Sequence, residues 1–214
     1  MRLFLSIIVF ITTLEHLQAE LLFDGKSLKG WRETDFAGHG EIEIKGSNLV
    51  INAGAALSGV TWTNAFPTNN YEITVEAKKV LGSDFFAATT FPVDGSHATF
   101  VAGGWGGGVV GISSLDGQDA SENETVKYHK FETDRWYALK IKITPGKIEA
   151  WIDDKEMVNL EIKGKKVGLR HGEIDLNKPF GIATYQTSGA IRRVELKHLS
   201  LPADKPVKPA QSTQ

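Results

Sequence analysis

The sequence predicts an all-β protein, a sandwich of two antiparallel sheets of the jelly-roll kind. Many short segments alternate apolar and polar side chains, and turns that contain glycine separate them. No window carries the sustained apolar stripe of an amphipathic helix. Short strands joined by frequent turns are typical of antiparallel sandwiches and barrels, so we expect little helix.

The clearest strand covers residues 71–78. Its side chains alternate between apolar and polar without a break, which is the pattern of a strand that is buried on one side. The apolar residues are therefore expected to share one face: Tyr71, Ile73, Val75 and Ala77.

A hairpin is predicted between residues 136–144 and 147–153. The first strand alternates in the same way, and Pro145-Gly146 supplies the turn into the second. The second strand carries Trp151 on its polar face. We interpret Trp151 as a residue that covers a sheet edge or packs under a loop, with contact to a bound carbohydrate as the alternative.

Further short strands are expected along the rest of the chain. They are separated by turn residues such as Gly46-Ser47-Asn48 and Asp153-Asp154-Lys155. The expected ranges are 41–45, 49–51, 85–91, 98–102, 109–113, 157–162, 180–185 and 191–199.

The two ends of the chain differ from its middle in composition. An apolar stretch at residues 3–14 precedes Ala19, which predicts a signal peptide over residues 1–19. The stretch is shorter than the ~20 residues of a membrane-spanning helix, and an uncleaved anchor or a buried helix is the alternative. Residues 202–214 contain three prolines and no aromatic residue, which predicts a disordered tail.

Composition limits the number of domains, the location and the partner. Residues 20–201 suit one sandwich domain. The chain has no cysteine, which excludes disulfides, and export without disulfides favours a bacterial protein that is secreted or periplasmic. A formal net charge of −2 without long basic runs argues against nucleic acid or an anionic membrane. We therefore expect a neutral molecule as partner, and the oligomeric state stays open.

Four segments carry a resemblance to a known family. They are residues 22–31 (LFDGKSLKGW), 69–76 (NNYEITVE), 136–154 and 180–196. Together they resemble the 3-keto-disaccharide hydrolase domain family, formerly domain of unknown function 1080. The resemblance implies a concanavalin-like jelly roll with a concave face for carbohydrate, and an activity that hydrolyses or eliminates 3-keto-glycosides.

The sequence departs from the family pattern in its middle and near its end. The family's central motifs are replaced by residues 83–89 and 110–116, where Asp116 matches a family aspartate. Gln186 matches the glutamine of the last motif, but the histidine that follows it in the family is absent. The chain is thus expected to be a divergent member with a glycan or disaccharide as partner.

A tryptophan stands among glycines in the segment after His97. Five glycines flank Trp105 within residues 103–108, so few side chains would separate its indole from a ligand. An open indole suits stacking on the apolar face of a sugar, and the alternative is a tryptophan tucked into a glycine-lined bulge. The run lacks the Lys-Ser/Thr of a phosphate loop, which excludes a nucleotide site of that kind.

Residues 116–124 form an acidic segment with four carboxylates. Such a density of oxygen donors can hold calcium or another divalent cation, and the expected ligands are Asp116, Asp119 and Glu122. A solvated acidic loop is the alternative.

A 3-keto sugar permits chemistry that differs from ordinary glycoside hydrolysis. The ketone acidifies the C2 hydrogen, so the C1 substituent can leave by elimination before water adds. This route requires one base and one electrophile for the enolate oxygen. The expected catalytic residues are His97, Asp116 and Gln186, and the expected substrate-binding residues are Asp84, Trp105, Trp151 and Arg192; His129 and Arg170 are further candidates for base and electrophile.

Three classes of function stay open at this point. The first is an enzyme that cleaves an oxidised glycoside. The second is a non-catalytic carbohydrate-binding module, in which Trp105 and Trp151 hold a glycan. The third is an extracellular adhesion or scaffold domain, which nothing in the sequence selects.

Overall fold

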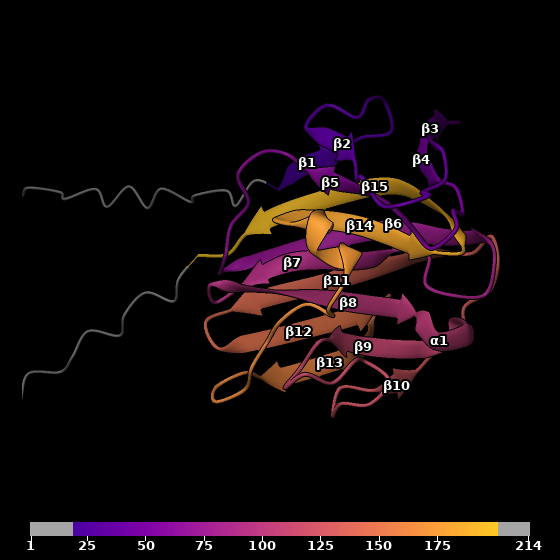
Figure 1. The fold of residues 1–214 in the computed structure, drawn as a ribbon. Coiled ribbons are helices and arrows are strands. Elements are labelled where there is room, and N and C mark those ends of the chain that lie inside the picture. The colour runs from indigo at the N-terminus through magenta and orange to yellow at the C-terminus, as the bar shows by residue number, and fades with distance from the viewer. Residues whose placement is uncertain (1–18, 201–214) are drawn as a thin grey trace, which may run out of the picture.

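Two antiparallel sheets pack against each other in the computed structural model, which describes residues 19–200 (Figure 1). The prediction of an all-β sandwich is confirmed. The predicted signal peptide, apart from its last residue, and the predicted tail lie outside the described residues. No helix within 19–200 is long and apolar enough to cross a membrane.

The first sheet has eight strands. β1 (Glu20–Phe23) pairs with β15 beside the main path. The order along the main path is β13 (Lys155–Glu161), β12 (Lys147–Ile152), β11 (Trp136–Thr144), β6 (Tyr71–Leu81), β15 (Ser188–His198), β4 (Asn48–Ile51) and β3 (Ile42–Lys45).

The second sheet has seven strands and carries the candidate site. Their order is β10 (Lys127–Tyr128), β9 (Val109–Ser113), β8 (Ser96–Gly103), β7 (Ala88–Val93), β14 (Phe180–Tyr185), β5 (Leu57–Trp62) and β2 (Trp31–Glu33). The described chain has only two short helical turns, α1 (Gly104–Gly107) and η1 (Glu173–Asn177).

The alternating segments predict their strands well. All four apolar residues predicted to share a face of β6 are fully buried, and β11 and β12 form the predicted hairpin. β5 was not predicted, because five of its six residues are buried and a strand covered on both sides shows no alternation. The strand predicted at 85–91 begins only at Ala88.

The core between the sheets is apolar, with one polar link across it. Tyr71 on β6 is fully buried, and its hydroxyl donates a hydrogen bond to the carbonyl oxygen of Pro92 on β7, 2.5 Å away. Burial raises the pKa of Tyr71 well above its usual value, because the phenolate would lose its hydration. The neutral phenol thus joins the two sheets.

The outer face of the second sheet is partly covered by the connection from β13 to β14. Residues 166–168 pair with 114–116 at the end of β9, and η1 then contacts β5 and β14. Figure 1 shows this connection in orange, with η1 over β14. We call residues 165–172 the strap.

Polar side chains attach η1 to the sheet. Buried Thr34 bonds to the Thr61 hydroxyl at 2.8 Å and donates to Asn177 Oδ1 at 3.2 Å. A Cβ at Gly181 would lie 2.2 Å from Asn177 Nδ2, so only glycine permits this close approach. η1 is therefore fixed against β5 and β14.

Candidate functional site

A cavity of about 430 Å³ opens on the outer face of the second sheet. This volume lies in the range of small-molecule sites. Its floor comes from the sheet: Ala88, Thr99, Val101 and Ser113. Its walls come from the strap, η1 and neighbouring loops: Leu57, Asp84, Phe85, Trp105, Arg170, His171, Gly172, Glu173, Ile174 and Tyr185.

Trp105 borders this cavity, on a turn that requires glycine. The indole residue is 41% exposed and has a left-handed backbone, with φ 49° and ψ 55°. Its neighbours Gly103, Gly106 and Gly107 also have positive φ, a conformation that side chains disfavour. The glycine run thus shapes a turn that places an indole at the edge of the cavity.

Asp84 also lines the cavity, but both of its carboxylate oxygens have backbone partners. Oδ1 accepts a hydrogen bond from Phe85 N at 2.8 Å, and Oδ2 accepts one from Gly106 N at 3.0 Å. The backbone N–H of Asp84 donates to the hydroxyl of Thr187 at 3.0 Å. Asp84 therefore fixes the wall that carries Trp105.

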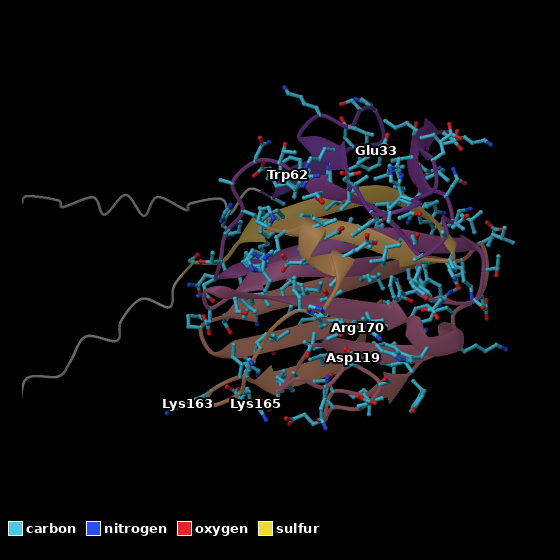
Figure 2. All side chains as sticks on the ribbon, viewed as in Figure 1. Glu33, Trp62, Asp119, Lys163, Lys165 and Arg170 are labelled. Atoms are coloured by element: carbon cyan, nitrogen blue, oxygen red, sulfur yellow. The ribbon has the colours of Figure 1, made fainter. Side chains whose placement is uncertain are left out.

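Arg170 faces Trp105 from the strap. Its guanidinium carbon lies 5.9 Å from the centre of the Trp105 ring. The same guanidinium pairs with Asp119, with 3.3 Å between Nη1 and Oδ2, and Figure 2 shows the two side chains close together. The other oxygen of Asp119 accepts a hydrogen bond from the hydroxyl of Ser113 at 3.1 Å, so a cation, a carboxylate and a hydroxyl are linked at the cavity.

His171 and Glu173 were missed by the sequence analysis. Both line the cavity, and Glu173 Oε1 also accepts a hydrogen bond from Ala37 N at 3.2 Å. One signal was present in the sequence, since residues 162–179 form a long connection between strands. Connections of that length are uncommon and often functional.

His97 lies in a neighbouring hollow of about 530 Å³, not in the cavity itself. The two hollows share Arg170, His171 and Gly172 as a common wall. Burial lowers the pKa of His97, the positive charge of Lys178 lowers it further, and Asp175 opposes both. The imidazole of His97 is therefore neutral at neutral pH.

Four other candidates lie outside the cavity. Asp116 Oδ1 accepts a hydrogen bond from Lys166 N at 2.7 Å, and exposed Gln186 donates to the carbonyl oxygen of Ala55 at 3.0 Å. Trp151 and Arg192 belong to the first sheet, where Lys140 Nζ lies 4.5 Å from the Trp151 ring centre and Arg192 pairs with Glu76. The structure does not bring these four residues together.

His129 sits apart from the cavity, among aromatic rings. Its ring centre is 4.7 Å from that of Phe131 and 5.8 Å from that of Tyr137. Burial lowers the pKa of His129, and the positive charges of Lys155 and Arg135 lower it further. The negative charge of Asp153 acts in the opposite direction.

The acidic segment does not gather its carboxylates around one point. Within residues 19–200, no three His, Cys, Asp or Glu side chains are placed to hold one metal ion. Asp116 and Asp119 have the protein partners given above, and Glu122 is exposed. Calcium binding by this segment stays a prediction, which melting with and without calcium tests.

Three solved structures share the fold at low identity. A putative glycosyl hydrolase from Parabacteroides distasonis has a TM-score of 0.55 and 11% identity, over 85% of this chain and 94% of that one. The Crh5 transglycosylase in complex with NAG has a TM-score of 0.57 and 12% identity, over 87% and 86%. The carbohydrate-binding module CBM66 from Bacillus subtilis has a TM-score of 0.51 and 12% identity, over 78% and 95%.

These identities show a shared fold alone, and no curated protein sequence matches the chain. A family model does match: its description is "3-keto-alpha-glucoside-1,2-lyase-like domain", and it covers residues 18–197. This match confirms the resemblance of the sequence motifs to that carbohydrate-related family. The chain therefore belongs to the 3-keto-alpha-glucoside-1,2-lyase-like domain family.

Proposed function

We propose that this protein cleaves 3-keto-glycosides by removing the proton next to the ketone, in the cavity on the outer face of the second sheet. One observation carries the proposal. Arg170 and His171, adjacent in the strap, line the same cavity as Trp105. This chemistry requires a base and an electrophile, and an aromatic ring can hold the sugar beside them.

The reaction starts at C2 of the oxidised ring. A base takes the C2 proton, and the electron pair of that bond forms a C2–C3 double bond while the ketone oxygen becomes an enolate. When the ketone re-forms, the electrons move to a C1–C2 double bond and the C1–oxygen bond breaks. The departing oxygen takes up a proton, and water then adds to the unsaturated ring.

Five of the residues that line the cavity have a role in this sequence of steps. Trp105 stacks against the sugar ring, and the guanidinium of Arg170 stabilises the enolate oxygen. His171 takes the C2 proton, since it is a histidine that lines the cavity beside Arg170, and histidine is the commonest general base in enzymes. The hydroxyls of Thr99 and Ser113 in the floor already bond to Thr90 and Asp119, and their oxygens can accept hydrogen bonds from the sugar.

Export to the periplasm or the exterior is part of the proposal. Its support is the sequence of residues 1–19, an apolar stretch followed by Ala19. Detection of a mature protein that begins at Glu20, outside the cytoplasm, would support it.

The activity is tested with a 3-keto-disaccharide and the matching ordinary disaccharide. We expect the enzyme to release a monosaccharide from the 3-keto substrate only, with transient ultraviolet absorbance from the unsaturated ketone. In deuterium oxide, the C2 position should take up deuterium. Absence of cleavage with and without added divalent cations would contradict the proposal.

Substitutions assign the base. His171→Ala should lower kcat by at least about 100-fold, the usual contribution of a general base. His198→Ala is the matched control, because His198 is exposed at the end of β15 in the other sheet. Equal activity of the two variants would exclude His171 as the base.

Binding without cleavage is the second candidate function. The observation that favours it is the position of Asp84, whose two oxygens are both occupied by backbone N–H groups beside an open indole. A binding module would retain affinity for the glycan while releasing no sugar in the same assay. Calorimetry on the sample that shows no cleavage separates this function from an inactive protein.

A further inference from the structure

The acidic segment, residues 116–124, is held closed by one buried side chain. Asn123 is 4% exposed, and its amide nitrogen shares its two hydrogens among three backbone carbonyl oxygens, those of Ile112, Gln118 and Asp119, at 2.7–3.1 Å. Its amide oxygen accepts hydrogen bonds from the backbone and hydroxyl of Thr125. Asn123 therefore joins the loop to β9, and its own amide oxygen is already bonded to Thr125.

The strap is fastened to this loop at several points. Ser114 and Gly168 exchange two backbone hydrogen bonds, of 2.7 and 3.1 Å. Asp116 N donates to Lys166 O at 2.8 Å, and Lys166 N donates back to Asp116 Oδ1 at 2.7 Å. Glu124 pairs with Lys165 in addition. Three carboxylates of the loop, those of Asp116, Asp119 and Glu124, thus have cationic or N–H partners in the strap.

Asp119 is the member of this contact that bonds to two residues of the cavity lining, Ser113 and Arg170. Its side chain is 21% exposed, and its carboxylate lies between the hydroxyl of Ser113 in the floor and the guanidinium of Arg170 in the wall. Its backbone carbonyl is fixed by Asn123. Arg170, which is 61% exposed, has Asp119 and Trp105 as its fixed neighbours on the two sides.

From these contacts we infer that Asp119 is a positioning residue, which orients the guanidinium of Arg170 toward the cavity. The inference rests on the proposed function for the role of Arg170 in the reaction. Arg170 is otherwise a long side chain with many rotamers, and a fixed carboxylate restricts them. An ion pair this exposed adds little to stability, so its effect is expected in the orientation of Arg170.

A double-mutant cycle tests the inference with the full-length mature protein. Asp119→Asn keeps the size of the side chain and an acceptor for Ser113, but removes the charge that holds Arg170. We expect kcat on the 3-keto-disaccharide to fall by about tenfold or more, with a small change in KM. In an Arg170→Gln background, Asp119→Asn should have no further effect, because its partner is gone. Additive losses would overturn the inference.

Glu124→Gln is the matched control. It removes the ion pair to Lys165 on the same loop and has no contact with the cavity. It should leave kcat unchanged, and both variants should melt within about 4 °C of the original protein. A loss of activity in Glu124→Gln equal to that in Asp119→Asn would show that general loosening of the loop is responsible, against the inference.

An NMR measurement that needs no catalysis tests the role of Asp119 independently of the proposed cleavage of 3-keto-glycosides. The Nε–H signal of Arg170, identified by its loss in Arg170→Lys, reports how rigid the guanidinium is on the picosecond to nanosecond timescale. Its order parameter should fall in Asp119→Asn and stay constant in Glu124→Gln. If the protein cleaves no 3-keto sugar, the proposed function fails while this result still decides the role of Asp119.

Discussion

The carboxylate of Asp84 accepts a hydrogen bond from the backbone N–H of Gly106, 3.0 Å away, and so holds the turn that carries Trp105. Asp84→Ala should release this turn and leave the Gly106 N–H without its partner. Quenching of the Trp105 fluorescence by acrylamide should rise, measured as the difference from the same variant with Trp105→Phe. Affinity for the glycan should fall with it.

The control for Asp84 is a second aspartate with the same kind of bond. Asp94 Oδ2 accepts a hydrogen bond from Gly146 N at 2.8 Å, in an exposed turn away from the cavity. Asp94→Ala should change neither quenching nor affinity. Equal effects of the two substitutions would contradict a specific role of Asp84 at the Trp105 turn.

Trp105→Ala should weaken binding of the glycan by about 1–3 kcal/mol, because the stacking surface and its buried apolar area are lost. Trp151→Ala is the matched control, since its ring lies on the other sheet beneath Lys140. Isothermal titration with the disaccharide measures both. Unchanged affinity of Trp105→Ala would remove this residue from the site.

The stability of the protein should fall as the pH drops below about 6.5, the ordinary pKa of histidine. Burial and Lys178 lower the pKa of His97 in the folded state, so the unfolded state binds the proton more readily. The loss begins as the pH falls through the unfolded pKa and ends below the folded pKa. Urea unfolding of the original protein and of His97→Gln between pH 5 and pH 8 measures it.

The contribution of His97 is the difference in free energy of unfolding between the original protein and His97→Gln from pH 5 to pH 8. His129 has a lowered pKa as well and contributes in the same direction, so His97→Gln should remove only part of the pH dependence. A pH dependence that is unchanged in His97→Gln would contradict the assignment.

Tyr71→Phe should lower the free energy of unfolding by about 1–2 kcal/mol. The substitution keeps the ring but leaves the carbonyl oxygen of Pro92 without its donor in the core. Tyr128→Phe is the control, because Tyr128 is 72% exposed. Thermal or urea unfolding compares the two, and equal stability of both variants would show that the bond between the sheets contributes nothing.

The fold was predictable wherever one face of a strand meets water. The sequences of β6 and β11 alternate between apolar and polar side chains, because one side of each strand is buried and the other is more exposed. β5 carries no such signal, because the second sheet is covered on its outer face by η1 and the loop at Phe36. That cover depends on contacts between distant residues, which local patterns do not contain.

The candidate site was predictable only in part, for a similar reason. Trp105 and Asp84 stand near glycine turns, a local signal, and both line the cavity. His171 and Glu173 reach it because the strap folds back across the sheet, which no local pattern shows. Trp151 and Arg192 have suitable chemistry, but they belong to the sheet that faces away from the cavity.

The cavity draws its floor and its strap wall from separate stretches of the chain. The strap joins the end of β9 by backbone pairing to residues 114–116, and Arg170 and His171 line the cavity. Val167 packs against the sandwich core, but the core itself is built mainly from the strands. The strap residues that would select a ligand thus differ largely from the residues that form the core. Replacement of residues 165–172 by a strap of equal length from another family member would be a direct way to exchange specificity on an unchanged scaffold.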